Sequence, residues 1–193
     1  MNMYDTGVIH GRFQILHNDH LRYLLAGKAM CRHLVVGITN PDPVLTNDVD
    51  VDPKRSESMS NPLTYFERLV MVREVLVEAG LALEEMTITP LPITRPELFR
   101  HYVPMDALFL LSIYDGWGRK KLEQFKSLGL KTHVLWEVKP GEKGISASEI
   151  RDLILRGQPW EHLVPCSSAR LLKKWDIPGR LKEMHQESAP NGQ

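Results

Sequence analysis

Residues 11–20 read Gly11-Arg12-Phe13-Gln14-Ile15-Leu16-His17-Asn18-Asp19-His20 and determine how the N-terminal part of the chain folds. The apolar pair Val8-Ile9 precedes this stretch, and a helical pattern follows it from Leu21. A strand, a glycine turn and a helix start in that order favour phosphate binding, because the helix N-terminus leaves backbone N–H groups free and its dipole attracts negative charge. The imidazoles of His17 and His20 can add hydrogen bonds to phosphate oxygens. We therefore predict a phosphate site at this turn.

The composition is that of an ordinary globular protein. The chain has 193 residues, of which 42% are hydrophobic, so it can form one domain with a sizeable core. Lys and Arg together number 24, as do Asp and Glu, which gives a formal net charge of zero. A neutral chain is a poor candidate for broad nucleic-acid binding, because that requires a basic surface. We expect small-molecule nucleotide substrates and no nucleic-acid partner.

The cysteines and the apolar segments indicate the cellular compartment in which we expect the protein. Cys31 and Cys166 lie far apart and form no Cys-x-x-Cys or His/Cys cluster, so we expect reduced thiols and no zinc site. The N-terminus has Asp5 and no long apolar segment, unlike a signal peptide. No apolar stretch approaches membrane-spanning length. These features favour a cytoplasmic protein with no membrane partner, and they leave homo-oligomer formation open.

Apolar runs alternate with helical patterns along residues 1–138. The predicted strands are short and rich in Val, Ile and Leu, as strands covered on both faces tend to be. They cover residues 6–10, 33–38, 86–89, 107–112 and 132–135. The predicted helices cover residues 20–30, 64–79, 96–102 and 117–128, and Thr64 with Glu67 forms a capping-box pattern. This alternation predicts an α/β fold with a doubly wound parallel sheet.

The pattern changes after residue 138. A charged loop with two glycines covers residues 139–144, and helices are predicted at residues 147–156, 167–175 and 178–185. Residues 187–193 have the composition of a flexible tail. We predict a single domain over residues 1–186, with an α/β core at 1–138 and a loop with C-terminal helices at 139–186.

A long polar loop covers residues 40–62. It carries Asp42, Asp48, Asp50 and Asp52, but it lacks the glycine and the terminal glutamate of an EF-hand loop. Loops of this length without structure of their own are usually functional lids or plain insertions. We interpret the loop in that way and place no protein metal site in it.

A second motif reads Ile145-Ser146-Ala147-Ser148-Glu149-Ile150-Arg151. With Gly11-Arg12-Phe13-Gln14 and His17-x-x-His20, it resembles the nucleotidyltransferases that share a histidine-x-glycine-histidine motif and an isoleucine-serine-x-serine/threonine-x-x-arginine motif. The Gly-Arg-Phe-Gln form is most similar to the archaeal-type nicotinamide mononucleotide adenylyltransferases. The resemblance covers nearly the whole chain. It implies a Rossmann-like sheet of five parallel strands in the order 3-2-1-4-5, with a small helical C-terminal part that includes a phosphate-binding loop.

The resemblance implies the transfer of AMP from ATP to nicotinamide or nicotinate mononucleotide, which gives NAD and pyrophosphate. Such a transfer needs in-line placement and neutralisation of phosphate charge. The implied catalytic residues are His17, His20, Arg12 and Arg151. The implied ATP- and phosphate-binding residues are Gly11, Arg12, Phe13, Gln14, His17, His20, Ser146, Ser148, Ile150 and Arg151. The resemblance also implies Mg²⁺, held mainly by the nucleotide phosphates.

Two departures from the family pattern leave alternatives open. The implied acceptor-binding residues, Phe99, Tyr114 and Trp117, match the family only loosely. Asp19 stands where the family has glycine, and a carboxylate beside a triphosphate is repulsive unless it turns away, caps the helix or meets Mg²⁺. One alternative is therefore a related adenylyl- or cytidylyltransferase with another phosphorylated acceptor. The other is a catalytically impaired nucleotide-binding regulatory protein.

Overall fold

The computed structural model describes residues 3–42, 58–138 and 144–188. Residues 43–57 of the long polar loop, including Asp48, Asp50 and Asp52, lie outside the described residues, as do residues 139–143 and 189–193. The strands are β1 (Tyr4–Gly11), β2 (Cys31–Thr39), β3 (Met86–Leu91), β4 (Leu108–Ile113) and β5 (Lys131–Glu137). Each contains most of the corresponding predicted strand and extends one or two residues further at one or both ends.

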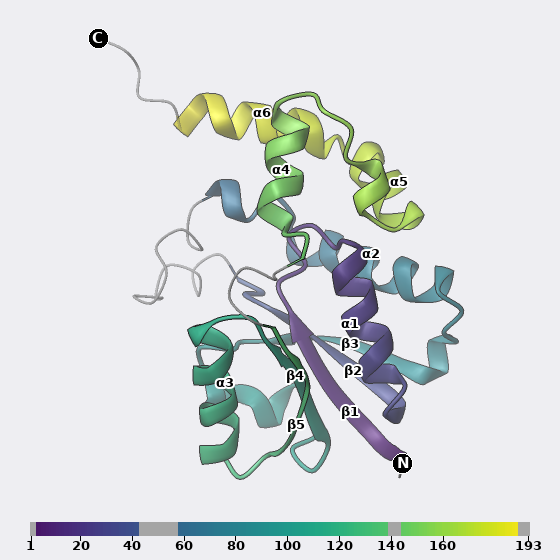
Figure 1. The fold of residues 1–193 in the computed structure, drawn as a ribbon, viewed down its shortest axis with the longest axis vertical. Coiled ribbons are helices and arrows are strands. Elements are labelled where there is room, and N and C mark those ends of the chain that lie inside the picture. The colour runs from purple at the N-terminus through teal and green to yellow at the C-terminus, as the bar shows by residue number, and fades with distance from the viewer. Residues whose placement is uncertain (1–2, 43–57, 139–143, 189–193) are drawn as a thin grey trace.

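These strands form one parallel sheet in the order β3-β2-β1-β4-β5 (Figure 1). In the middle of the sheet, Ile9 of β1 pairs with Val36 of β2 on one side and with Leu110 of β4 on the other. The predicted fold class and strand order are confirmed. Because all strands run the same way, their carboxyl ends meet at one edge, where ligands bind in open α/β sheets.

Helices cover both faces of the sheet. On one face, α1 (Asn18–Lys28) and α2 (Tyr65–Glu78) pack on a core that includes Ile9; on the other, α3 (Gly116–Ser127) packs on a core that includes Val8. Neighbouring residues of a strand point to opposite faces, so β1 contributes to both cores. The segment Pro96–His101, predicted as a helix, is a 3-10 helix on the α3 side.

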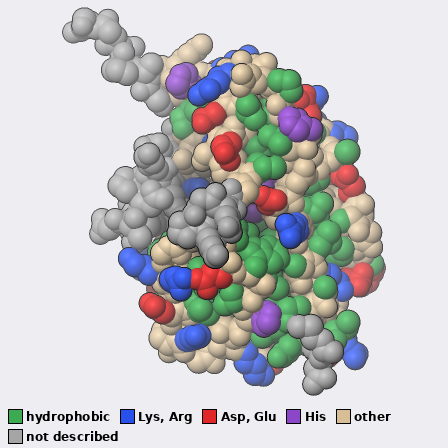
Figure 2. Space-filling model, viewed as in Figure 1, with side chains coloured by type: hydrophobic (Ala, Val, Ile, Leu, Met, Phe, Trp, Pro, Cys, Tyr) green, Lys and Arg blue, Asp and Glu red, His purple; other side chains and the backbone are tan. Residues whose placement is uncertain are grey.

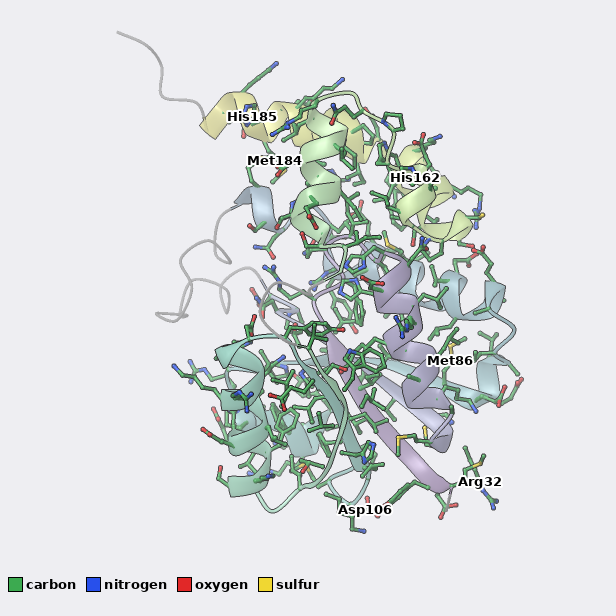
Figure 3. The ribbon with its side chains drawn as sticks, viewed as in Figure 1. Arg32, Met86, Asp106, His162, Met184 and His185 are labelled. Carbon is green, nitrogen blue, oxygen red and sulfur yellow. The ribbon has the colours of Figure 1, made fainter. Side chains whose placement is uncertain are left out.

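The C-terminal helices are α4 (Ala147–Leu155), α5 (Cys166–Lys174) and α6 (Ile177–Ser188). They lie beyond the carboxyl edge of the sheet (Figure 1), and their apolar side chains belong to the same core as α1 and α2. The Asn18 side-chain amide donates to the carbonyl of His162 at 3.0 Å, which ties α1 to the segment before α5. Figure 3 shows His162 among the C-terminal helices. The C-terminal helices are therefore held against the start of α1.

The charged side chains on the surface are mixed in sign, as the net charge of zero suggests, and the two cysteines are not paired. Figure 2 shows basic and acidic side chains interspersed over one face, without a patch of a single sign. Cys31 is buried, Cys166 is exposed, and both are free thiols. Within the part of the chain that the structure describes, no helix is both long and apolar enough to cross a membrane.

Candidate active site

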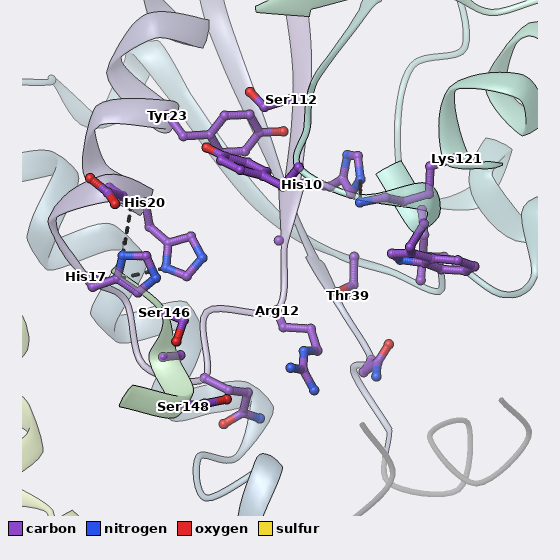
Figure 4. A pocket seen from close by; sticks show the side chains of 18 of the residues that line it. His10, Arg12, His17, His20, Tyr23, Thr39, Ser112, Lys121, Ser146 and Ser148 are labelled. Carbon is purple, nitrogen blue, oxygen red and sulfur yellow. Dashed lines mark hydrogen bonds between the residues drawn. The ribbon is translucent and has the colours of Figure 1, made fainter. Parts of the chain in front are cut away.

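One pocket of about 320 Å³ lies at the carboxyl edge of the sheet. It brings together the turn after β1, the start of α1 and the start of α4 (Figure 4), and the start of α4 is more than a hundred residues from the other two in sequence. The residues from the two motifs that line it are Gly11, Arg12, Gln14, His17, Asp19, His20, Ile145, Ser146, Ala147 and Ser148. The convergence that the two motifs predict is present in the fold.

The two histidines form a reciprocal cap at the start of α1. The His20 backbone N–H donates to Nδ1 of His17 at 3.4 Å, and the His17 backbone N–H donates to Nδ1 of His20 at 3.5 Å. Their rings stack with centroids 3.7 Å apart. His17 is the N-cap, so the helix begins at Asn18 rather than at the predicted His20. An imidazole nitrogen here takes the role that Ser, Thr or Asp usually takes at an N-cap.

Both imidazoles are neutral near pH 7. Burial lowers the pKa of His17 to about 4, although Asp19 and Glu149 raise it. Burial and the neighbouring His17 lower the pKa of His20 well below its ordinary value. Because each Nδ1 accepts a backbone N–H, the proton of each neutral ring is on Nε2. The His17 ring thereby has a neutral hydrogen-bond donor of the kind that binds a phosphate oxygen.

The turn before α1 depends on a close ring contact. Phe13 has a positive φ of 52° and is fully buried, and its ring packs edge-on against His20 with centroids 5.3 Å apart. A Cβ at position 11 would be 2.7 Å from the Phe13 ring, so only glycine fits there. Phe13 therefore supports the histidine pair from behind and does not line the pocket.

The start of α4 forms the second wall. Ser146 is the N-cap of α4, and its Oγ accepts from the Glu149 N–H at 3.2 Å. Ser148 lines the pocket in the first turn, and its Oγ accepts from the Arg151 guanidinium at 3.1 Å. Anions are favoured at a helix start of this kind, because free backbone N–H groups and the helix dipole both point toward them.

Arg151 differs from the expectation of a direct phosphate contact. It is 6% exposed, does not line the pocket, and donates to the carbonyl of Gln14 at 2.6 Å. Its guanidinium thus joins the β1–α1 turn to Ser148 on α4. In this structure Arg151 is a positioning residue for both walls.

Asp19 joins the two motifs directly. Its Oδ2 accepts a hydrogen bond from the Ile145 backbone N–H at 2.9 Å. A Cβ at Gly144 would overlap the same carboxylate, so the absence of a side chain there allows the close approach. The structure shows a placement that was not among the three expected: the carboxylate binds the backbone before α4, and His17 rather than Asp19 caps α1.

Arg68 fixes the floor of the pocket, a role that was not predicted from the sequence. It is 2% exposed and donates to the carbonyls of Thr39 at 2.7 Å, Asn40 at 2.7 Å and Arg12 at 3.0 Å. Burial lowers its pKa to about 10, so it stays charged at neutral pH. The side chain of Gln14 adds a second tie by exchanging two hydrogen bonds of 2.9 Å with the backbone of Leu63.

Two further predicted site residues lie in the core. Phe99 is fully buried in the α3-side core, with its ring edge-on to Phe125 at 6.1 Å, so it cannot stack on an acceptor as expected. Ile150 is fully buried among the C-terminal helices and does not reach the pocket. The other two predicted acceptor-binding residues, Tyr114 and Trp117, do line the pocket.

Other lining residues were not predicted, chiefly His10 and Lys121. Each had a signal in the sequence. His10 directly precedes Gly11 at the carboxyl end of its strand, and Lys121 lies four residues after Trp117, which puts both on one face of α3. Neither position can be assigned to a site from the sequence, because the sequence does not show which face of α3 borders the pocket.

The described residues contain no group of three or more His, Cys, Asp or Glu side chains arranged to hold a metal ion. Among the described residues that line the pocket, Asp19 is the one carboxylate, and one of its oxygens is already engaged by Ile145.

Comparison with known proteins identifies the family. Residues 8–153 match the cytidylyltransferase-like family model, so the chain belongs to the cytidylyltransferase-like family. The protein is a nucleotidyltransferase.

Two relatives differ in their reported reactions. The chain is 50% identical over 177 residues to a phosphonoformate cytidylyltransferase from Streptomyces viridochromogenes, which covers 92% of this chain and 95% of the relative. It is 28% identical over 177 residues to a nicotinamide-nucleotide adenylyltransferase from Thermococcus onnurineus, with 91% of this chain and 86% of the relative covered.

A solved structure shares the fold. A bifunctional NMN adenylyltransferase/ADP ribose pyrophosphatase from Francisella tularensis superposes with a TM-score of 0.66 at 17% identity. The match covers 96% of this chain and 54% of that chain, so this chain spans about half the length of that protein. At this identity the likeness concerns the fold alone.

Proposed function

We propose that this nucleotidyltransferase transfers the cytidylyl group of CTP, bound with Mg²⁺, to a small phosphonate or phosphate acid. The observation that carries the proposal is the 50% identity, over 92% of the chain, to a relative named for cytidylyl transfer to phosphonoformate. Nicotinamide mononucleotide adenylyl transfer, which the motifs alone favoured, rests on relatives near 28% identity. Cytidylyl transfer was one of the alternatives that the sequence left open.

The proposed reaction is one displacement at phosphorus. An oxygen of the acceptor attacks the α-phosphorus of CTP, the bond from that phosphorus to the bridging oxygen of the β-phosphate breaks, and pyrophosphate leaves with the electron pair. Charge on the transferring and leaving phosphates rises along this path, so fixed donors accelerate the reaction. The Nε2–H of His17 and the N–H groups at the start of α4 are suited to that role, with Arg12 between the two walls.

The test is a product assay with paired substrates. The purified protein is incubated with MgCl₂, CTP or ATP, and phosphonoformate or nicotinamide mononucleotide, and products are read by mass spectrometry and pyrophosphate release. The proposal expects a CMP–phosphonoformate adduct with one pyrophosphate per adduct. NAD formation from ATP, without any cytidylyl adduct, would instead support the adenylyltransferase. Nucleotide binding without turnover of any pair would support the impaired regulatory protein.

A further inference from the structure

The pocket has a cationic side that the two motifs do not supply. The Nζ atom of Lys121, on α3, lies 3.4 Å from Nε2 of His10, at the end of β1 (Figure 4). Both residues line the pocket, on the side away from His17 and His20. Thr39, at the end of β2, and Trp117, in α3, also line the pocket, and these four residues are defined here as the α3 side of the pocket.

The charge on the α3 side belongs to Lys121. Burial and the charge of Lys121 lower the pKa of His10 well below its ordinary value, so the imidazole is neutral. A lysine ammonium can only donate hydrogen bonds, so Nε2 of His10 accepts from it and the ring proton is on Nδ1. That Nδ1 is buried and makes no hydrogen bond to any described residue.

A third part of the pocket has a different chemistry. Tyr23 and Ser112 lie together there, above the two histidines in the view of Figure 4, and Tyr114 also lines the pocket. Ser112 Oγ is buried and lacks a partner among the described residues. The aromatic rings of Tyr23 and Tyr114 suit an uncharged nucleobase, which can stack on them but gains little from an ammonium.

We infer that Lys121, supported by His10, binds a second anionic group of the acceptor, so that the enzyme selects small acids that carry a carboxylate besides the attacking phosphonate. This inference rests on the proposed function and assigns the selectivity to the α3 side. The attacking phosphonate faces the α-phosphate between the motifs, and the carboxylate faces Lys121. An ammonium–carboxylate hydrogen bond gives strong selectivity in a partly enclosed site, because both partners are charged.

The experiment compares two probes by isothermal titration calorimetry in the presence of CMP. Phosphonoformate carries the carboxylate, and methylphosphonate lacks it. The wild-type protein should bind phosphonoformate about 10- to 100-fold more tightly than methylphosphonate, the range for one charge-assisted hydrogen bond. Lys121→Met keeps the apolar stem and should abolish the preference. Lys120→Met, at an exposed position next in sequence, should retain it.

The outcomes separate this inference from the proposed function. An equal preference in the wild type and in Lys121→Met, or no phosphonoformate preference in the wild type, would overturn the role of Lys121. Cytidylyl transfer is assayed on the same proteins with CTP. Transfer without a Lys121-dependent preference would support the proposed function and overturn only the role of Lys121. His10→Asn is a second variant that should weaken phosphonoformate binding and leave CMP binding unchanged; weakening of both equally would contradict a local role. Far-UV circular dichroism verifies that each variant is folded.

Discussion

The carboxylate of Asp19 accepts a hydrogen bond from the backbone N–H of Ile145, with 2.9 Å between Oδ2 and the nitrogen. The two residues belong to different motifs and lie on different walls of the pocket. Asp19 occupies the position where the resembled family has glycine, and Gly144 leaves room for it. At this position the family's glycine has no side chain. Here the Asp19 side chain links the two walls through a hydrogen bond between residues far apart in sequence.

This pair predicts a non-additive double-mutant cycle. Asp19→Gly removes the tie, and Gly144→Ala displaces the carboxylate from it, so each should weaken CTP binding and lower the free energy of unfolding by about 1 to 3 kcal/mol. In the double variant the added methyl meets no carboxylate, so the second change should cost almost nothing. Denaturant unfolding and CTP titration measure both effects. Full additivity would show that the two positions act separately.

His17→Asn should separate helix capping from chemistry. Asparagine is a good N-cap and can still accept the His20 N–H, so α1 should form as before. The imidazole donor is lost, and removing one transition-state donor lowers kcat by about 10²- to 10³-fold. Steady-state pyrophosphate release measures kcat, and circular dichroism measures helix content. Wild-type kcat in this variant would remove His17 from the proposed mechanism.

The stability of the free protein should fall at acid pH. The pKa of His17 is about 4 in the folded protein, below its ordinary value of 6.5, so the unfolded chain binds the extra proton between these values. Stability is then fully present above about pH 6.5 and declines as the pH falls toward 4. From pH 7.5 to pH 5 this residue alone should cost about 2 kcal/mol.

Urea unfolding at the two pH values tests that slope. His17→Asn should reduce the loss by about 2 kcal/mol, because its side chain does not titrate. His20, whose pKa is also lowered, contributes to the remaining slope. An identical pH dependence in the variant and the wild type would show that His17 is not buried in its neutral form.

Arg68→Met should destabilise the pocket floor. The change leaves the carbonyls of Thr39, Asn40 and Arg12 without their guanidinium partner, which should lower the free energy of unfolding by about 3 to 5 kcal/mol. Arg73→Met, on the exposed side of the same helix, is the matched control and should change it by less than about 0.5 kcal/mol. An equal loss of unfolding free energy in the two variants would contradict the role of Arg68 in holding the three carbonyls of the pocket floor.

Much of the fold follows from local patterns in the sequence. Val8-Ile9 and the other apolar runs mark the strands, and Thr64 with Glu67 forms the predicted capping box at the start of α2. The two motifs also predict the pocket that they share. These features depend on neighbours in sequence, where spacing carries the information.

The remaining site features depend on contacts between distant segments. Phe99 and Trp117 are both aromatic residues near strand ends, yet one is in the core and the other lines the pocket, because packing of α3 decides which is covered. Arg151 has the spacing of a phosphate ligand but is held by Gln14 and Ser148. Lys121 acquires its role only once α3 packs on β4 and β5, which brings its ammonium to His10 at the end of β1.

The measurement closest to the central claim is the affinity for CTP with Mg²⁺ in variants of both walls. His20→Ala alters the α1 wall and Ser148→Ala the α4 wall, while Ser127→Ala, at the exposed end of α3, is the control. If the two walls hold one triphosphate, calorimetry should show CTP binding weakened at least about tenfold in each wall variant, corresponding to 1.4 kcal/mol, and unchanged in the control. Wild-type affinity in either folded wall variant would contradict a shared nucleotide site.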